Sequence, residues 1–350
     1  MSVSVKINTR TLSSQTTGVQ RYLIELLKHS KPNFTEVTPK SKYGGIQGHL
    51  WEQAILPLHC RKSILFSPGN TGPLSVSRQV VTIHDLAALD HPEWTTKKFS
   101  SWYQYLIPRL VHKAKRIITV SQFTKERLVA NTGLSCDKII VIPNGVDRRF
   151  RPRDASTAFD VATKLNLPST RYFLTTGSLE PRKNLGNLIA AWNMICNDLP
   201  NDIWLVIAGG KGAGHIFREI DGSVNGVRIH YTGHVDESDL PELYSGAMAF
   251  GYMSSYEGFG LPPLEAMASG VPVITGNRAS LPEVVGNAGL MVDPHDVTAI
   301  ADGIWRLLID EQLRLNFSIL GLQQASRFNW AVSGKLTWET VCGVWMSANW

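Results

Sequence analysis

Short runs of β-branched and aromatic residues alternate with longer stretches in which apolar residues recur at helical spacing. Strands that alternate with helices in this way are typical of βαβ units on a parallel sheet. In the first half of the chain the pattern predicts strands at 3–7, 63–67, 80–83, 116–120 and 138–142, and helices at 19–29, 97–115 and 122–131. Ser121 directly precedes the last of these helices, so its side chain is expected to cap the first turn.

The alternation restarts after a polar stretch at 148–168, which contains proline and arginine and which we interpret as a link between two domains. Beyond it the pattern predicts strands at 172–176, 204–208, 227–231, 249–252 and 271–275, and helices at 187–196, 237–244, 262–268, 280–285 and 297–309. The sequence therefore predicts two doubly wound α/β domains, over 1–160 and 161–330. In such sheets ligands bind beyond the carboxyl ends of the strands, so two facing sheets are expected to border one cleft.

Length and composition agree with two globular domains. The chain has 350 residues, of which 43% are hydrophobic and 18% are charged. No apolar run approaches the roughly 20 residues that span a bilayer, and the N-terminus lacks the apolar core of a signal peptide. The four cysteines, at 60, 136, 196 and 342, form no C-x-x-C pair. This spacing argues against a disulfide framework or a zinc site, and we expect a cytoplasmic protein.

Charge is distributed unevenly between the two halves. Residues 1–150 contain 21 Lys and Arg against 9 Asp and Glu, a net charge of +12, whereas residues 151–350 contain 14 against 20, a net charge of −6. Two interpretations remain open. The difference is either ordinary variation between two solvated surfaces, or a sign that the first half faces an anionic partner such as a membrane surface, a phosphorylated lipid or a nucleic acid.

The motif E-G-F-G-L-P-P-L-E at 257–265 carries the strongest chemical signal. Its two glycines permit close approach of the backbone to a ligand, and its two prolines suit the first turn of a helix. The free N–H groups of a helix N-terminus favour a phosphate. Glu265 would then bind vicinal ribose hydroxyls and Glu257 the transferred sugar. The alternative is that Glu265 only complements the helix dipole and that Glu257 is a surface loop residue.

A second motif, G-S-L-E-P-R-K-N at 177–184, follows a predicted strand. Arg182 and Lys183 would neutralise the charge that develops on a departing diphosphate. The alternative is an exposed basic turn. Two weaker features are Thr16-Thr17-Gly18-Val19, which would deliver amides at the start of a helix, and His84-Asp85 at the end of a strand, which would contact a sugar.

Several common nucleotide-binding and hydrolase signatures do not occur. No G-x-G-x-x-G follows a strand, since 209–214 fails both that spacing and the P-loop pattern, and there is no G-x-S-x-G. There is also no D-x-D, which argues against an aspartate clamp for a divalent metal. We therefore expect no metal and no cofactor, and a diphosphate neutralised by Arg182, Lys183 and backbone amides alone.

The order and spacing of these motifs are similar to those of the retaining family 4 glycosyltransferases (glycosyl transferases group 1) over nearly the whole chain. The shared landmarks are Gly18-Val19, His84-Asp85, Val120-Ser121, P-N-G-V-D at 143–147, E-P-R-K-N at 180–184, Thr232-Gly233, Glu257 with Glu265, and G-V-P-V at 270–273. The resemblance implies a GT-B fold of two Rossmann-like domains facing across a cleft, with the acceptor on the first and the donor on the second. It also implies that a last helix, at 331–350, crosses back onto the first domain.

The same resemblance implies roles for individual residues. Arg182 and Lys183 would bind the diphosphate, Glu265 the ribose and Glu257 the donor sugar, and His84 would contact the donor hexose near the reaction centre. Together with these catalytic and binding groups, the resemblance implies donor contacts from Gly18, Val19, Gly177, Gly233, His234, Val235, Gly258, Phe259, Gly260 and Leu261.

The implied reaction is transfer of a hexose, with retention, from a nucleoside diphosphate sugar to a glycan or lipid-linked acceptor in surface polysaccharide synthesis. The leaving phosphate would deprotonate the acceptor, so that no side chain acts as nucleophile. Mannose from GDP-mannose ranks first, and rhamnose or another hexose second. The rival functions are a GT-B phosphorylase, a sugar-nucleotide epimerase, and a sugar-nucleotide-binding protein without catalysis.

The segment 97–109 is both basic and aromatic. It is either a surface that docks peripherally on the inner face of an anionic membrane, or a core helix with one basic face. No module that reads DNA or RNA is recognisable, so we do not expect a nucleic-acid partner.

Overall fold

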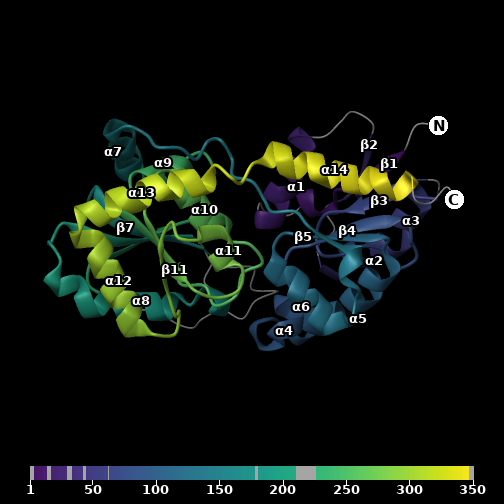
Figure 1. Cartoon of the computed structure of the whole chain (residues 1–350), viewed down its shortest axis with the longest axis horizontal. Helices are drawn as coiled ribbons and strands as arrows, with labels where there is room; N and C mark the ends of the chain where they lie inside the picture. Colours follow the sequence, from purple (N-terminus) through teal and green to yellow (C-terminus); the bar gives the residue numbers. More distant parts are fainter. Residues whose placement is uncertain are drawn as a thin grey trace. The chain divides into compact units, whose positions relative to one another are not determined.

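The computed structural model describes residues 4–13, 17–29, 34–41, 45–61, 63–177, 180–209 and 226–346 (Figure 1). The chain divides into two compact units. Unit 1 contains residues 1–92, 97–145 and 329–350, and unit 2 contains residues 93–96 and 146–328. The first long segment of unit 1 therefore ends earlier than residue 160, the predicted boundary, and the last helix belongs to unit 1.

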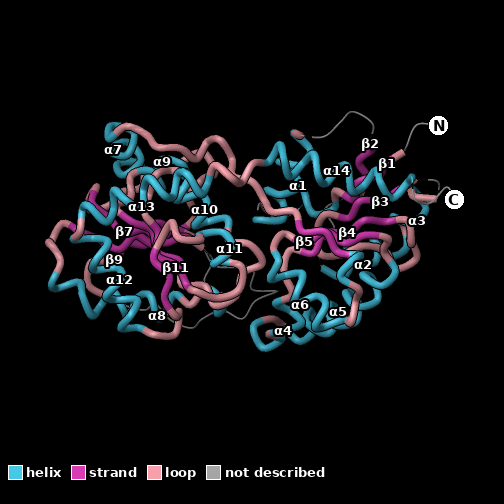
Figure 2. Tube along the Cα trace, in the orientation of Figure 1, coloured by secondary structure: helices cyan, strands magenta, loops and turns pink. Residues whose placement is uncertain are grey.

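Unit 1 is built on a parallel sheet that has six strands within its described residues, in the order β2-β1-β3-β4-β5-β6 (Figure 2). The strands are β1 (Val5–Asn8), β2 (Phe34–Val37), β3 (Ile64–Ser67), β4 (Gln79–Ile83), β5 (Arg116–Thr119) and β6 (Ile139–Val141). β3 and β4 are buried at every position, as expected of central strands covered on both faces.

Helices cover both faces of this sheet. On one face, α5 (Lys97–Lys113) and α6 (Gln122–Thr132) pack on Val81 and Ile83 of β4. On the other face, α1 (Gly18–Lys28) lies against α14 (Trp330–Met346), whose Trp338 contacts Phe66 of β3. The remaining elements are η1 (Arg10–Ser13), α2 (Gly45–Ala54), α3 (Leu56–His59), α4 (Ala87–Asp90) and η3 (Cys136–Lys138), and η2 (Pro92–Trp94) begins at the last residue before the short segment 93–96 that belongs to unit 2.

Unit 2 repeats the architecture with a second parallel sheet, again of six described strands, in the order β12-β11-β10-β7-β8-β9. The strands are β7 (Arg171–Thr176), β8 (Ile203–Ala208), β9 (Ile229–Gly233), β10 (Ala249–Tyr252), β11 (Val273–Gly276) and β12 (Leu290–Val292). The chain builds the half β7-β8-β9 first and then returns to place β10 beside β7. The order of the strands therefore reverses between β7 and β10, which is the topological switch point of this sheet.

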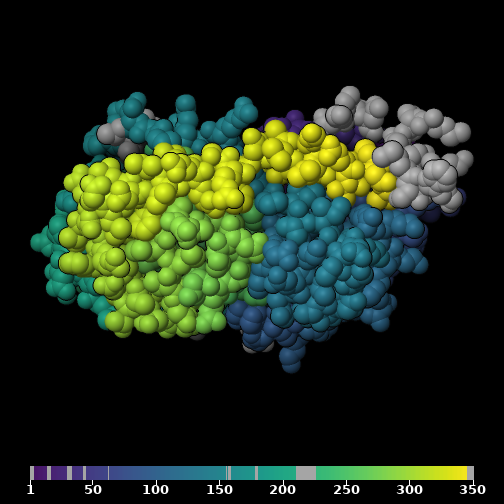
Figure 3. Space-filling view, viewed as in Figure 1, coloured from purple at the N-terminus to yellow at the C-terminus, as the bar shows by residue number. Residues whose placement is uncertain are grey.

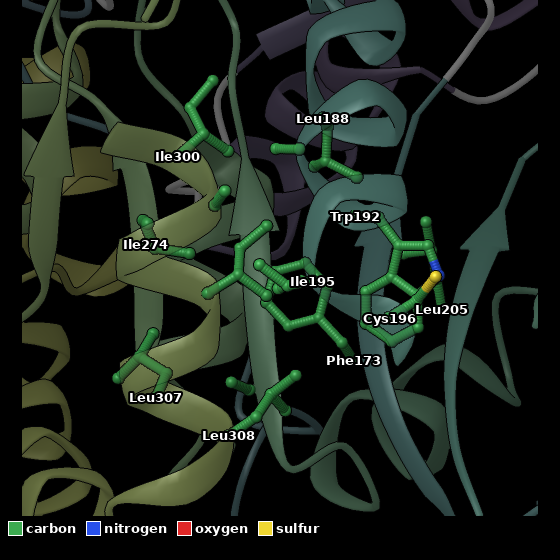
Figure 4. Packing of buried hydrophobic residues seen from close by; sticks show 14 of the residues in the cluster. Phe173, Leu188, Trp192, Ile195, Cys196, Leu205, Ile274, Ile300, Leu307 and Leu308 are labelled. Carbon is green, nitrogen blue, oxygen red and sulfur yellow. The ribbon is translucent and has the colours of Figure 1, made fainter. Parts of the chain in front are cut away.

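One face of the unit 2 sheet is covered by α8 (Leu185–Ile195) and α12 (Val297–Ile309). Their buried residues, among them Trp192 and Leu307, pack against Phe173 and Ile274 of the strands (Figure 4). The helices that complete the unit are α7 (Ala155–Lys164), η4 (Pro181–Lys183), η5 (Cys196–Asp198), α9 (Leu240–Ser245), α10 (Leu261–Ala268), α11 (Leu281–Val285) and α13 (Glu311–Ala325). Residues 290–325 form much of the face of unit 2 that Figure 3 shows.

Most elements predicted from the hydrophobic pattern are confirmed, and Ser121 caps α6 by accepting a hydrogen bond from the Thr124 amide at 3.1 Å. The interpretation of 148–168 as a link between the domains is wrong, because the stretch lies within unit 2 and ten of its residues form α7. Besides α7 and the short 3-10 helices, the elements that the sequence did not predict are β2, β12, α2, α3, α4 and α13.

Candidate active site

The two strongest motifs meet at the switch point of the unit 2 sheet. Arg182 and Lys183 lie in η4, which follows β7, and Glu257 lies in the loop that follows β10. Because β7 and β10 are hydrogen-bonded neighbours, their carboxyl ends adjoin. Open α/β sheets bind ligands at this place.

Glu257 lies at the centre of a buried ionic cluster. Its Oε1 accepts a hydrogen bond from Lys183 Nζ at 2.7 Å, and its Oε2 accepts one from Arg182 Nη1 at 3.1 Å. Arg182 Nε also donates to Glu180 Oε2 at 2.7 Å. The side chains of Arg182 and Lys183 are 15% and 14% exposed, so these ion pairs are largely shielded from water.

Two polar residues that the sequence analysis did not identify complete the cluster. Tyr252, the last residue of β10, donates its hydroxyl to Glu257 Oε1 at 2.9 Å and also accepts a hydrogen bond from Lys183. Ser254 Oγ lies 2.7 Å from the same carboxylate oxygen and 3.0 Å from the Arg182 carbonyl. The carboxylate is therefore held in one orientation by four side chains.

The electrostatics follow from this geometry. Burial alone would raise the pKa of Glu257, but Arg182 and Lys183 outweigh burial and lower the pKa from 4.5 to about 2. Burial, assisted by the adjacent Arg182, lowers the pKa of Lys183 in spite of the attraction of Glu257. Burial also raises the pKa of Tyr252, and the nearby Glu257 carboxylate acts in the same direction.

Three neighbouring strands of unit 2 end at glycines with positive φ. Gly177 (φ 143°) follows β7, Gly209 (φ 146°) follows β8, and Gly233 (φ 69°) ends β9. The Gly209 amide donates to the Gly233 carbonyl at 2.9 Å, and a Cβ on Gly209 would lie 2.0 Å from the Gly177 carbonyl oxygen. Only glycine fits this close approach, so the edge presents bare backbone beside the ionic cluster. The predicted contacts Gly177, Gly233, His234 and Val235 all lie along this edge, and Val235 is buried.

The segment 257–261 leads from the cluster into α10. Gly260, with φ of 113°, precedes the helix, and Ser280 Oγ lies within 2.9 Å of the carbonyls of Glu257 and Phe259 and so fixes the loop. Gly258 and Leu261 lie in this same loop and first turn. Glu265 lies on α10 and is 5% exposed. The structure therefore places 258–261 at a helix N-terminus, as predicted.

The remaining predicted donor contacts belong to unit 1. Gly18 opens α1 as expected, with Thr17 as the capping residue, and Val19 follows it in the first turn. His84 directly follows β4 and is buried, and its Nε2 donates to the Pro68 carbonyl at 2.6 Å. Burial lowers the pKa of His84, so the ring is held neutral with Nδ1 as its acceptor nitrogen. Residue 16 and residues 178–179 lie outside the described residues.

Unit 1 carries a second buried polar cluster, which includes His49 and Glu52 of the segment 49–53. It lies at the switch point of the unit 1 sheet, between β1 and β3. Glu52 of α2 is inaccessible to solvent and accepts hydrogen bonds from Asn8 Nδ2 at 2.6 Å and Thr71 Oγ1 at 3.0 Å. Its carboxylate also lies 3.6 Å from Arg10 Nε and 3.8 Å from His49 Nδ1.

Several polar atoms of this cluster make no hydrogen bond within the described part of the chain. They are Arg10 Nε, His49 Nδ1, Glu52 Oε2 and, next to the His49 ring, Trp102 Nε1. Buried polar atoms without partners cost about 1–3 kcal/mol each, so a group of them at a switch point indicates a ligand-binding role.

The structure also bears on the basic and aromatic segment 97–109. Its helix, α5, buries Leu106, Ile107, Leu110 and Val111 in the core of unit 1, and of its four aromatic side chains Tyr105 alone is exposed. The segment is thus a core helix with one basic face. Among the described residues, no helix has the length and apolarity needed to cross a membrane, and the four cysteines are free.

Comparison with known proteins identifies the family. Residues 160–322 match "Glycosyl transferases group 1", and residues 57–150 match "Glycosyltransferase Family 4". The chain is 31% identical over 353 residues to O-antigen chain mannosyltransferase B of Escherichia coli, a match that covers 90% of this chain and 93% of that protein. It is 30% identical to the serotype-specific mannosyltransferase WbdA of Escherichia coli, over 74% of this chain but 32% of that much longer protein.

Solved structures share the fold. HepE from Anabaena, in complex with UDP and glucose, superposes with a TM-score of 0.75 at 17% identity, over 98% of this chain and 100% of that one. WaaG, a glycosyltransferase involved in lipopolysaccharide biosynthesis, gives a TM-score of 0.73 at 14% identity, over 97% of this chain and 100% of that one. Taken with the sequence relatives, these matches show that the chain is a glycosyltransferase with the GT-B fold and belongs to family 4 (glycosyl transferases group 1).

Proposed function

We propose that this protein transfers mannose, with retention, from GDP-mannose to a glycan or lipid-linked acceptor during synthesis of a cell-surface polysaccharide. The observation that carries the proposal is the cluster of Arg182, Lys183 and Glu257 at the switch point of unit 2. Support for mannose comes from the relatives, since the E. coli protein matched over nearly its full length is named an O-antigen chain mannosyltransferase.

The cluster supplies what a diphosphate leaving group requires. Arg182 offers a planar fork of donors and Lys183 a compact charge, and both are held in place by hydrogen bonds. When the donor enters, the two cations exchange Glu257 for phosphate oxygens, and Glu257 becomes available to sugar hydroxyls. The amides of 258–261 add further donors at the start of α10, and Glu265 binds the ribose. Preorganised charge of this kind is commonly the largest contribution to such a transfer.

Retention follows in this proposal from a same-face reaction. The bond between the anomeric carbon and the leaving phosphate oxygen breaks first, and the acceptor oxygen then bonds to the anomeric carbon on the same face. The acceptor proton passes to the leaving phosphate, so no protein nucleophile takes part. Neutral His84 contacts the hexose from unit 1. Metal independence is part of the same proposal, because the two positive charges of Arg182 and Lys183 offset the negative charges of the diphosphate.

On the acceptor side we propose the Glu52 cluster of unit 1. Arg10 and His49 have exposed fractions of 14% and 18%, so a ligand can reach them, whereas Glu52 is inaccessible and positions them. Trp102 stands beside His49 with 5.5 Å between ring centroids. Cationic and aromatic donors next to a buried carboxylate suit a hydroxyl-rich pyranose. Glu52→Gln is expected to raise the KM for the acceptor while donor binding stays unchanged, because the buried counter-charge of Arg10 is lost.

The donor is tested by thermal shift with GDP-, UDP- and ADP-sugars, since a ligand that binds the native state raises the melting temperature. GDP-mannose is expected to give the largest shift. A larger shift with UDP-glucose or a GDP-deoxyhexose would replace mannose by that sugar and leave the site assignment standing.

The site is tested by Lys183→Ala and Glu265→Ala, each of which is expected to abolish transfer in a folded protein. Lys335→Ala is a matched control. Lys335 is exposed on α14, so this substitution is expected to leave transfer unchanged. Turnover at the wild-type rate in either site variant would refute the assignment. Loss of activity with a chelator and its recovery with manganese would refute the metal-independent chemistry.

A further inference from the structure

Four segments of unit 1 lead into the sheet at one edge, because parallel strands begin at the same edge. Residues 58–63 lead into β3, 75–78 into β4, 112–115 into β5, and 133–138 into β6. The strand register aligns these starts, since Leu65 pairs with Gln79, Val80 with Arg116, and Ile117 with Ile139. We call this side of unit 1 the entry edge. It is opposite the edge at which His84 follows β4.

Cations gather along the entry edge. Among their described residues, its four segments and the first residue of β5 contain a single acid, Asp137, against six Lys and Arg residues, namely Arg61, Arg78, Lys113, Lys115, Arg116 and Lys138. Lys138 is half-buried and the other five are exposed. Like charges held this close repel one another, which is a cost that an anionic partner removes.

Main-chain contacts hold part of this row in place. Arg116 donates to the Asp137 carbonyl at 2.7 Å, and Lys138 Nζ donates to the His112 carbonyl at 2.6 Å. The Lys115 amide donates to the Gln79 carbonyl at 2.9 Å, which brings Lys115 next to the start of β4. Burial lowers the pKa of Lys138, and repulsion by Lys115 and Arg116 adds to this effect, as expected for cations within electrostatic reach.

Exposed apolar side chains flank the same row. Leu58, at the end of α3, is 57% exposed, and Ile55, just before that helix, is 43% exposed. Ile140 in the edge strand β6 is 36% exposed. Basic residues beside exposed aliphatic ones suit a membrane interface, where the cations meet lipid phosphates and the aliphatic groups enter the headgroup region.

We propose that the entry edge of unit 1 is a docking surface for an anionic phospholipid bilayer. A nucleic acid would satisfy the charges but would leave Leu58, Ile55 and Ile140 exposed, and the row offers no exposed aromatic side chain on which a base could stack. The proposal stands on unit 1 alone and does not depend on the identity of the donor sugar.

Sedimentation with vesicles tests the proposal. The full-length protein is expected to bind vesicles of phosphatidylcholine containing phosphatidylglycerol, to bind pure phosphatidylcholine weakly, and to be released by salt. A cation near an anionic bilayer contributes about 1 kcal/mol, or roughly fivefold in affinity. The double variant Arg78→Gln/Lys115→Gln is therefore expected to bind about 25-fold more weakly.

A matched control removes the same charge elsewhere in unit 1. Lys97 and Lys98 are exposed at the start of α5, the end of that helix farthest from the entry edge. Lys97→Gln/Lys98→Gln is expected to change vesicle affinity by less than about twofold. Equal weakening by the two pairs, no binding at low salt, or equal binding to neutral and anionic vesicles would overturn the proposal.

Two further measurements separate this proposal from the proposed function. Donor binding and transfer to a soluble acceptor are expected to be unchanged in Arg78→Gln/Lys115→Gln, because both side chains are exposed and lie away from the carboxyl edges. Vesicle binding without any transfer would count against the proposed function alone. Binding to duplex DNA with the same variant sensitivity, and no binding to vesicles, would assign the entry edge to nucleic acid instead.

Discussion

Glu257→Gln replaces the central carboxylate of the ionic cluster by a neutral group of nearly the same shape. The pKa of Glu257 is about 2, against an ordinary value of 4.5, a lowering of about 2.5 units. At about 1.36 kcal/mol per unit, ionised Glu257 contributes about 3 kcal/mol to the stability of unit 2 at neutral pH. For a unit of this size, that corresponds to about 6–12 °C in melting temperature.

The sign of the pH dependence follows from the direction of the shift. A carboxyl group whose pKa is lowered on folding stabilises the protein above its unfolded pKa, and this stabilisation is lost as the pH falls through the folded pKa. With values of 4.5 and about 2, the contribution is complete at pH 7 and falls to about 1.4 kcal/mol at pH 3. Glu257→Gln has no group that titrates at this position, so the difference in stability between wild type and the variant becomes smaller at low pH.

Calorimetric melting of the full-length protein at pH 7 and pH 3 measures this gap. Wild type is expected to melt about 6–12 °C above Glu257→Gln at pH 7 and about 3–6 °C above it at pH 3. Glu311→Gln, which alters an exposed carboxylate at the start of α13, is expected to lie within about 0.5 kcal/mol of wild type at pH 7. An unchanged gap at the two pH values would show that packing, and not ionisation, stabilises the cluster.

Further predictions follow from the same edge of unit 2. Burial and Arg182 lower the pKa of Lys183, so kcat/KM is expected to decline on the alkaline side below pH 10.5, and Lys183→Arg is expected to move that decline to higher pH. Gly209→Ala is expected to lower the stability by about 3 kcal/mol in urea unfolding, since the new Cβ would meet a backbone oxygen. Gly186→Ala in α8, where a Cβ meets open space, is the control and is expected to be neutral or stabilising.

The central strands and the site motifs could be predicted because their signals are local. Val80–Val81 in β4 and the α12 pattern at 297–309 are apolar enough to indicate their own structure. By contrast, β2 (F-T-E-V) has two exposed positions. It forms a strand because it pairs with β1, and this interaction cannot be recognised from the residues of β2 alone. The segment that forms α7 is polar, so its sequence indicates a link and not a helix.

The residues of the site likewise divide into those that local motifs predict and those that only the fold brings together. Arg182, Lys183, Glu257 and Glu265 follow from motifs of short range, and the structure brings the first three into contact. Tyr252 looks like the end of an ordinary strand in the sequence. Its hydroxyl matters because β10 lies beside β7, which is a property of the sheet order. The pairing of Asn8 with Glu52 spans 44 positions, and no local pattern indicates it.

The position of α14 has a consequence for the order in which the protein is made. Trp338, Val341 and Val344 of α14 are buried in unit 1, although they follow the whole of unit 2 in the chain and are synthesised after it. Residues 146–328 of unit 2 leave the ribosome before that helix does. Unit 2 can therefore finish folding first during translation, while the face of the unit 1 sheet that α14 covers stays open to chaperones and to aggregation until α14 has been synthesised.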